Sequence, residues 1–240
     1  MTSDRYVDGT YLETVPDWHV GDSPWKAAQV LRMLEKNHLS PRSVYDVGCG
    51  AGQILVELQR ALGQSVEFAG FDIASQAIAI AQPNENSRLK FYNTDFLSAA
   101  VPEADLLLLL DVFEHVPDYI GFLKALRERA RWVVFHIPLD ICAKTVLRKS
   151  CWMLYMRERY GHLHYFTKES ALATISDAGF QIVDHFYTDD LQISPDMVPR
   201  GFRPRLLYEI RKNIYRLKPD VAVSMFESYN LMLLAHGNIN

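Results

Sequence analysis

A glycine-rich turn is the part of this sequence whose residue types point most directly to chemistry. A β-branched and aromatic run, Ser43 to Val47, predicts a strand, and Gly48, Gly50 and Gly52 follow it before an apolar-periodic segment, Gln53 to Leu62, predicted to be helical. Glycines let backbone amides approach a ligand closely, and a helix amino terminus favours negative charge. The sequence therefore predicts a cofactor-binding loop here.

Acidic residues at the predicted strand ends narrow the choice of ligand. Asp46 lies near the carboxyl end of the first strand, where a carboxylate suits an ammonium group better than a pyrophosphate. Asp72 ends the strand-like run FAGFD and could accept hydrogen bonds from two adjacent ribose hydroxyls. After the third predicted strand, Asp95 could accept from an adenine amino group while Phe96 packs on the ring. Together these residues indicate a nucleoside that also carries an ammonium group.

A nicotinamide dinucleotide is the alternative ligand for such a turn. Its GxGxxG fingerprint, counted from Gly48 and Gly50, would place the third glycine at position 53, which is Gln53. The glycine comes one residue early, at Gly52, and no Tyr-xxx-Lys pair lies in a suitable helix. An oxidoreductase or epimerase is therefore the third hypothesis.

The order of these motifs between Ser43 and Phe186 resembles the class I S-adenosylmethionine-dependent methyltransferases, and DVFEHV, residues 111–116, is similar to the DVxEHL-type signature of small-molecule members. The resemblance implies S-adenosylmethionine as cofactor and S-adenosylhomocysteine as product. It also implies which residues bind the cofactor, in chain order from its methionine part through the ribose and the adenine to the sulfonium. These residues are Asp46, Gly48, Cys49, Gly50, Gly52, Asp72, Ile73, Asp95, Phe96, Asp111 and Val112.

The amino-terminal arm, TVPDWHVGDSPWKA, resembles the lead-in of a subset of these enzymes. By that resemblance Trp18, His19, Trp25 and Lys26 would cap the cofactor, and Lys26 would meet its carboxylate. Trp25 and Lys26 complete the expected cofactor-binding set.

Histidines are the candidate catalytic residues. Transfer of an electrophilic methyl group depends mainly on positioning, and a base helps only when the acceptor is protonated. His115, which follows the fourth predicted strand, is the first candidate base, and His162 and His164 could descend from a lid. Each histidine also has a structural interpretation. His115 could simply lie in a turn that opens a helix, and His162 and His164 could anchor the lid. His136 could be a strand residue with a satisfied hydrogen bond. No amide-nitrogen signature follows the fourth strand, so we expect transfer to oxygen or carbon.

Alternating strand and helix patterns must position these residues. They predict an α/β fold: a Rossmann-like, doubly wound sheet of about seven strands, mostly parallel with the last strand antiparallel, and helices on both faces. We expect one domain over residues 1–240. Its parts are an arm and helix (1–42), a cofactor-binding half (43–139), a lid insertion (140–166) and a carboxyl-terminal part (167–240) with a basic insertion at 195–221.

Composition limits the classes of partner and the location that we expect. With 240 residues, 25 Lys plus Arg against 29 Asp plus Glu and a net charge of -4, the chain gives no global reason to expect nucleic acid. The three cysteines show no ligand spacing, so we expect no metal. The polar opening does not resemble a signal peptide, and the leucine run 106–110 is far too short to span a membrane, so we expect a cytoplasmic location.

Two segments leave functional alternatives open. The basic run of residues 200–218 could be a solvated helix face, or could contact an acidic acceptor or anionic lipid headgroups. The apolar lid, most simply packed over the active site, could instead dip into a membrane interface, so a peripheral membrane contact stays open. The first hypothesis is methyl transfer to a small molecule; the alternatives are a cofactor-binding module without turnover and a lipid-like or macromolecular acceptor.

Overall fold

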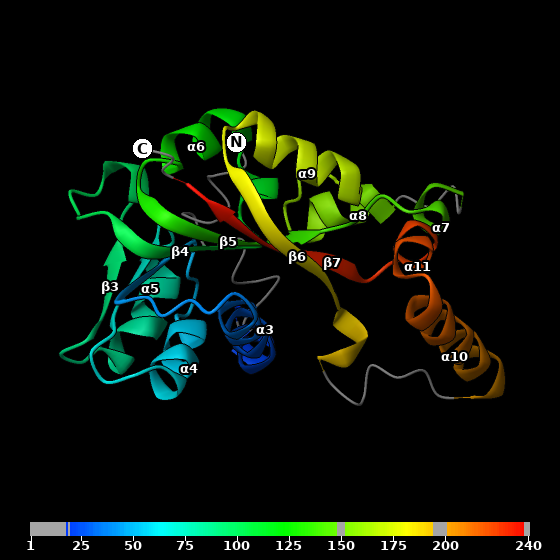
Figure 1. Cartoon of the computed structure of the whole chain (residues 1–240), viewed down its shortest axis with the longest axis horizontal. Coiled ribbons are helices and arrows are strands. Elements are labelled where there is room, and N and C mark those ends of the chain that lie inside the picture. The colour runs from blue at the N-terminus through cyan, green and yellow to red at the C-terminus, as the bar shows by residue number, and fades with distance from the viewer. Residues whose placement is uncertain (1–17, 19, 148–151, 194–200, 238–240) are drawn as a thin grey trace.

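A seven-stranded sheet is the frame of the computed structural model, which describes residues 18, 20–147, 152–193 and 201–237 (Figure 1). The strand order is β3-β2-β1-β4-β5-β7-β6; β7 runs antiparallel to β5 and β6, and the other neighbouring strands pair in parallel. The predicted fold class is thus confirmed. The strands are β1 (Ser43–Val47), β2 (Glu67–Asp72), β3 (Leu89–Asn93), β4 (Ala104–Leu110), β5 (Ala130–Pro138), β6 (Gln181–Asp189) and β7 (Tyr229–His236).

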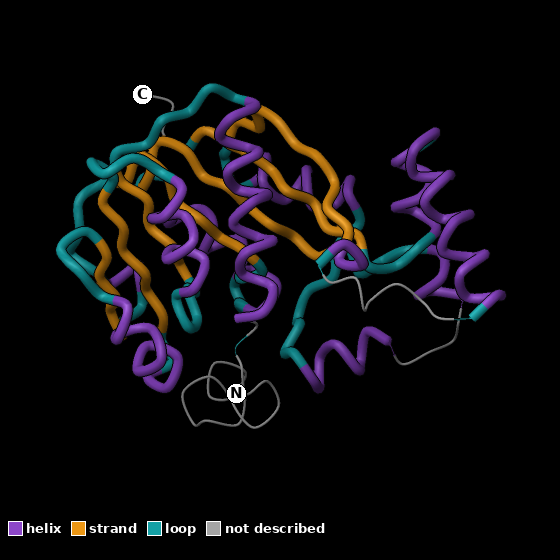
Figure 2. Tube along the Cα trace, turned by 90° about the horizontal axis from the view of Figure 1, so that it is seen from below, coloured by secondary structure: helices purple, strands orange, loops and turns teal. Residues whose placement is uncertain are grey.

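Helices cover both faces of this sheet. In Figure 1, α3, α4 and α5 lie below it and α6 and α9 above it; Figure 2 shows successive strands rotated relative to one another, as in twisted sheets generally. The helices are α3 (Ser23–Lys36), α4 (Gln53–Ala61), α5 (Ser75–Ala81), α6 (Tyr119–Leu126), α7 (Ala143–Leu147), α8 (Trp152–Arg159), α9 (Lys168–Asp177), α10 (Phe202–Leu217) and α11 (Pro219–Met225). Short 3-10 turns are η1 (Val20–Asp22), η2 (Gln82–Asn84), η3 (Phe96–Ser98), η4 (Phe113–His115) and η5 (Asp190–Gln192).

The leucine run of β4 shows how the sheet is held. Side chains alternate between the faces of a strand, so Leu106 and Leu108 pack with α3, α4 and α5, while Leu107 and Leu109 pack with α6 and α9. All four are fully buried, and burying one leucine contributes about 2 kcal/mol. One hydrophobic core on each face of the sheet thus holds β4 in place. The carboxyl end of β4 lies at the edge of the sheet that carries the candidate site.

Element boundaries differ from the sequence predictions at a few ends. The apolar run Gln181 to Phe186 predicts the sixth strand, but β6 continues to Asp189, because its pairing with β7 extends to Tyr229. The pattern of Asp118 to Arg129 predicts a helix, but α6 ends at Leu126, since the chain turns there into β5. Asp22 occupies the cap position of α3, but its side chain makes no capping hydrogen bond.

The two insertions have separate places. The lid, residues 140–166, contains α7 and α8, and the basic insertion forms α10 and α11 between β6 and β7 (Figure 1). Arg211 anchors α10 by two 2.8 Å bonds to the buried carboxylate of Asp189. Residues 195–200 of this insertion lie outside the described residues. The organisation of residues 1–240 as a single domain stays a prediction. Among the described helices, none has the length and apolar character needed to cross a bilayer.

Candidate active site

A cavity of about 900 Å³ opens where the parallel strands end. The turns after β1, β2, β3, β4 and β5 line it, and the start of antiparallel β7 reaches the same edge. Lid residues of α8 close one side. Ligands of open α/β sheets bind at this edge, so the predicted site residues converge where the topology favours binding.

Glycine is required at two positions of the turn after β1. Gly48, Gly50 and Gly52 all have positive φ, which side chains disfavour. A Cβ at Gly48 would come within 2.9 Å of Val112, and one at Gly52 within 2.5 Å of the Phe91 ring. At Gly50 the nearest atom would be 3.8 Å away, on Trp18, and all three glycines line the cavity. The turn therefore presents bare backbone to the cavity.

Asp72 ties the turns after β1 and β2 together. One carboxylate oxygen accepts from the Gly50 amide at 2.9 Å and the other from the Ala74 amide at 2.8 Å. Burial raises the pKa of Asp72, and the backbone hydrogen bonds oppose that rise. Asp72 lines the cavity, where its remaining lone pairs can accept from ligand hydroxyls.

Asp46 lies behind the glycine turn rather than in the cavity wall. Its side chain is buried, and Oδ2 has no hydrogen-bond partner among the described residues. Burial, with Asp72 nearby, raises the pKa of Asp46 to about 8. Cys49 lines the cavity, and burial raises the pKa of its thiol well above the ordinary value, so the thiol is a poor nucleophile.

The turns after β2 and β3 bring together the residues expected at the adenine ring. Ile73, Asp95 and Phe96 all line the cavity. Asp95 Oδ1 accepts from the Leu97 amide at 3.0 Å and so caps η3, while the Phe96 ring packs edge-on against Phe71. An exposed aliphatic side chain, Ile73, and a buried ring, Phe96, thus both belong to the cavity wall.

The amino-terminal arm contributes two of its four expected residues. Trp18 and Lys26 line the cavity, whereas Trp25 is absent from the cavity wall and packs edge-on against His136. The cofactor contact expected of Trp25 has no support in this placement, because its ring points to the sheet. His19 lies outside the described residues.

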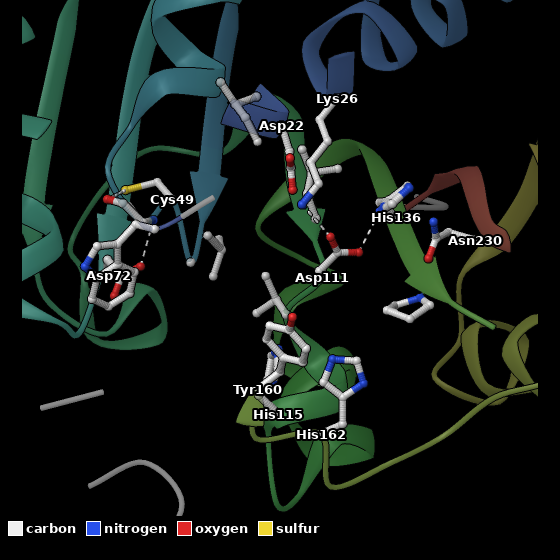
Figure 3. Close-up of a pocket in the computed structure, with 18 of the residues that line it drawn as sticks. Asp22, Lys26, Cys49, Asp72, Asp111, His115, His136, Tyr160, His162 and Asn230 are labelled. Carbon is white, nitrogen blue, oxygen red and sulfur yellow. Dashed lines mark hydrogen bonds and ion pairs between the residues drawn. The ribbon is translucent and has the colours of Figure 1, made fainter. Parts of the chain in front are cut away.

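Lys26 meets Asp111 instead of standing free at the cavity wall. Their ion pair measures 2.6 Å, and Asp111 Oδ1 lies 2.6 Å from Nδ1 of His136 (Figure 3). Nε2 of His136 lies 2.9 Å from the hydroxyl of Thr188. Despite burial, His136 and Lys26 hold the pKa of Asp111 far below its ordinary value, and Asp111 in turn raises that of Lys26 against the effect of burial. Asp111 has a positive φ of 59°, a strained conformation that this network holds.

Sequence reasoning missed a polar wall on this side. His136 has the hydrogen bonds expected of a strand residue, but it also lines the cavity, beside Asp190 and Asn230. Asn230 Nδ2 donates to Asp190 at 2.5 Å, and burial raises the pKa of Asp190 to about 6. The available signal was positional: His136 and Asp190 come at the ends of parallel strands, as Asp72 does.

Two of the three candidate histidines meet at the lid end of the cavity. The rings of His115 and His162 are 5.0 Å apart, nearly perpendicular, and both line the cavity (Figure 3). His162 Nδ1 lies 2.8 Å from Asp140 Oδ2. His164 instead points away: its Nε2 donates to the Val116 carbonyl at 3.0 Å, and it does not line the cavity. His164 is therefore placed as a lid anchor, not as a base.

Glu114 lies directly behind the two histidines. Its backbone carbonyl accepts from the amides of Leu163 and His164 at 2.8 and 3.1 Å, which holds this segment of the lid on η4. Its carboxylate is completely buried, and neither oxygen has a hydrogen-bond partner among the described residues. Burial, with Asp111 adding to it, raises the pKa of Glu114 well above the ordinary value. We refer to Glu114, His115 and His162 as the histidine pole.

Comparison with known proteins identifies the family. Residues 24–185 match the model of a family described as a methyltransferase domain. The chain belongs to this methyltransferase family. The match includes the glycine turn, the DVFEHV segment and the lid, and it confirms the resemblance indicated by the order of the motifs.

Curated relatives match part of the chain. The mitochondrial ubiquinone biosynthesis O-methyltransferase of Schizosaccharomyces pombe is 32% identical over 104 residues, 40% of this chain and 37% of the relative. The ubiquinone biosynthesis O-methyltransferase of Paraburkholderia xenovorans is 32% identical over 107 residues, 41% of this chain and 45% of the relative. The aligned part thus spans less than half of these relatives.

Solved structures share the fold over nearly the whole chain. A chain from the complex between the Haloferax volcanii Trm112 methyltransferase activator and a putative methyltransferase has a TM-score of 0.69 at 14% identity, covering 100% of this methyltransferase chain and 99% of its own length. The magnesium protoporphyrin IX methyltransferase of Synechocystis with bound S-adenosylhomocysteine has a TM-score of 0.59 at 17% identity, covering 92% and 86%. These likenesses extend the shared fold beyond the family match, to β7.

Proposed function

We propose that the cavity binds S-adenosylmethionine over the turns after β1, β2 and β3 and transfers its methyl group to a hydroxyl oxygen of a small molecule held toward the lid. The observation that carries the proposal is one continuous cavity with a backbone-lined glycine turn at one side and the histidine pole at the other. Membership of the methyltransferase family and the O-methyltransferase relatives support it.

The chain's residues fit this cofactor. The buried Oδ2 of Asp46, which has no hydrogen-bond partner among the described residues, lies behind the glycine turn. A Cβ at Gly48 or Gly52 would clash with neighbouring side chains. An ammonium group that reaches this turn would give the carboxylate a partner. Asp72 has acceptor capacity for a ribose diol, and Ile73 and Phe96 offer apolar surface for a purine. When bound, the cofactor supplies an electrophilic methyl group. Asp111, paired with Lys26 and hydrogen-bonded to His136, adds no unpaired charge to the cavity.

His162 is the residue best placed to accept the acceptor's proton. Asp140 beside Nδ1 favours the tautomer that carries its proton there, leaving the Nε2 lone pair available. The polar wall of His136, Asp190 and Asn230 can orient other polar groups of the acceptor, and the aromatic lid residues Trp152 and Tyr155 help to exclude water. In the transfer, the oxygen–methyl bond forms as the sulfur–methyl bond breaks, sulfur keeps the electron pair, and the hydroxyl proton passes to His162.

The test is methyl transfer itself. Protein incubated with methyl-labelled S-adenosylmethionine and a panel of hydroxylated small molecules should yield a labelled product. His162→Gln should lower kcat about a hundredfold with little change in the KM for the cofactor, whereas His164→Gln, two residues away and pointing elsewhere, should lower kcat less than twofold. Binding without transfer to any panel compound or cell extract would favour the cofactor-binding module. Cytoplasmic location and a membrane contact stay predictions.

A further inference from the structure

We propose that the histidine pole is a binding site for one divalent transition-metal ion, with Zn²⁺ as the best-matched ion. The oxygen and nitrogen ligand atoms of Glu114, His115 and His162 lie within 4.8 Å of one another. Two imidazoles and one carboxylate are a donor set that suits zinc and its neighbours rather than magnesium or calcium, which prefer oxygen ligands. This departs from the expectation, based on cysteine spacing, that the chain has no metal site.

The buried carboxylate of Glu114 is the independent observation that points to a cation. Its exposed fraction is 0%, and both oxygens are without a hydrogen-bond partner in the described structure. Nε2 of His115 lies 3.8 Å from Oε1 of Glu114, which is beyond hydrogen-bond distance. A buried carboxylate left in this condition is costly, and a coordinated cation removes the cost.

The surroundings of His162 match those of a metal-binding histidine. Such histidines commonly donate the second ring N–H to a carboxylate, which fixes the tautomer and directs the other nitrogen at the ion. The 2.8 Å approach of Asp140 Oδ2 to Nδ1 of His162 provides this arrangement. Because the Glu114 carbonyl binds the Leu163 and His164 amides, His162 is also held beside the other two ligands by backbone hydrogen bonds.

The spacing requires only a small closure. Four-coordinate zinc with bonds of about 2.1 Å places its ligand atoms about 3.4 Å apart. The upper bound of 4.8 Å on the separations at the pole exceeds this by about 1.4 Å, which rotations of the imidazole and carboxylate groups can supply. His115 and His162 face the cavity, so a fourth coordination position would open toward the proposed acceptor, as in catalytic zinc sites.

The catalytic consequence rests on the proposed function, but binding of the ion does not. An acceptor hydroxyl that takes the fourth position becomes more acidic and can lose its proton to a buffer base, with the oxygen held by the ion. Nε2 of His162 is then a ligand rather than the proton acceptor. A metal-stripped protein that methylates its acceptor, and loses this activity in His162→Gln, would show the base mechanism to operate without an ion.

Calorimetric titration of the metal-stripped chain with ZnCl₂ and with MgCl₂ tests the site directly. We expect one Zn²⁺ per chain, bound at least a hundredfold more tightly than Mg²⁺. His162→Gln and the isosteric Glu114→Gln should each weaken Zn²⁺ binding at least tenfold, Asp140→Asn tenfold to a hundredfold, and His164→Gln less than twofold. The visible spectrum of the Co²⁺-loaded protein should show the strong d–d bands of four-coordinate cobalt.

Thermal unfolding of each variant without metal separates loss of a ligand from loss of folding. Equal Zn²⁺ affinity and stoichiometry in the wild type, His162→Gln and Glu114→Gln would overturn the proposal, as would tighter binding of Mg²⁺ than of Zn²⁺. Weakening by His164→Gln as large as that by His162→Gln would also contradict it. Methyl transfer by a protein that binds no Zn²⁺ would reject the metal site and leave the proposed function in place.

Discussion

The two sides of the cavity are built in different ways. On the glycine side, each functional residue lies within a few positions of a strand end, and its type can be recognised in the sequence, as at Gly48 and Gly52. On the lid side, partners come from distant parts of the chain: Lys26 and Asp111 are 85 positions apart, and His136 and Thr188 are 52 apart. The residues of the first side can be recognised from their types at strand ends, whereas the second side is defined by side-chain pairs that form only once the sheet has assembled.

The largest expected effect tests the glycine side. Gly52→Ala places a Cβ against Phe91 at a residue with φ of 74°, so we expect a loss of about 3 kcal/mol in the free energy of unfolding. Gly50→Ala is the matched control: φ is also positive, at 53°, but the nearest atom is 3.8 Å away, so its cost should be about 1 kcal/mol. Urea denaturation measures both. Equal losses would mean that conformation alone, not close approach, requires glycine at position 52.

The second prediction tests the assembled side. Lys26→Met leaves Asp111 with one partner fewer at a site where both side chains are largely buried, and should cost about 2 kcal/mol of stability. Lys36→Met, on the same helix, removes an exposed ion pair with Asp184 and should cost less than about 0.5 kcal/mol. Denaturant midpoints check the difference. A smaller loss for Lys26→Met than for Lys36→Met would contradict the view that Asp111 depends on α3.

A pH effect sharpens the role of Asp46. Its pKa of about 8 means that the unliganded carboxyl is mostly protonated at neutral pH, whereas an ammonium ligand requires the carboxylate. Binding of S-adenosylmethionine should therefore release a proton, and affinity should fall about tenfold as the pH drops from 7 to 6. Calorimetry in buffers of different ionisation enthalpy measures that proton. Asp46→Asn should remove the pH dependence; a wild-type affinity that is the same at both pH values would refute this assignment.

The contrast also explains what the sequence could predict. The sheet, its antiparallel last strand and the cofactor turn follow from hydrophobic periodicity and from the types of residue at strand ends, such as Gly48 and Asp72. The partners of Lys26 could not be predicted, because the lysine lies on a helix whose register against β4 depends on the packed core. His162 and His164 looked equivalent in sequence; only the hydrogen bonds of Asp140 and Val116 separate them.

Calorimetric titration with S-adenosylmethionine of the wild type, Asp72→Asn and His162→Gln is the most direct test of this division of the cavity. We predict micromolar binding by the wild type, a loss of affinity of about thirtyfold in Asp72→Asn, which removes one charge-assisted acceptor, and a change below twofold in His162→Gln. No binding by the wild type, or an equal loss in both variants, would contradict the assignment of the glycine side to the cofactor and of the histidine pole to the acceptor.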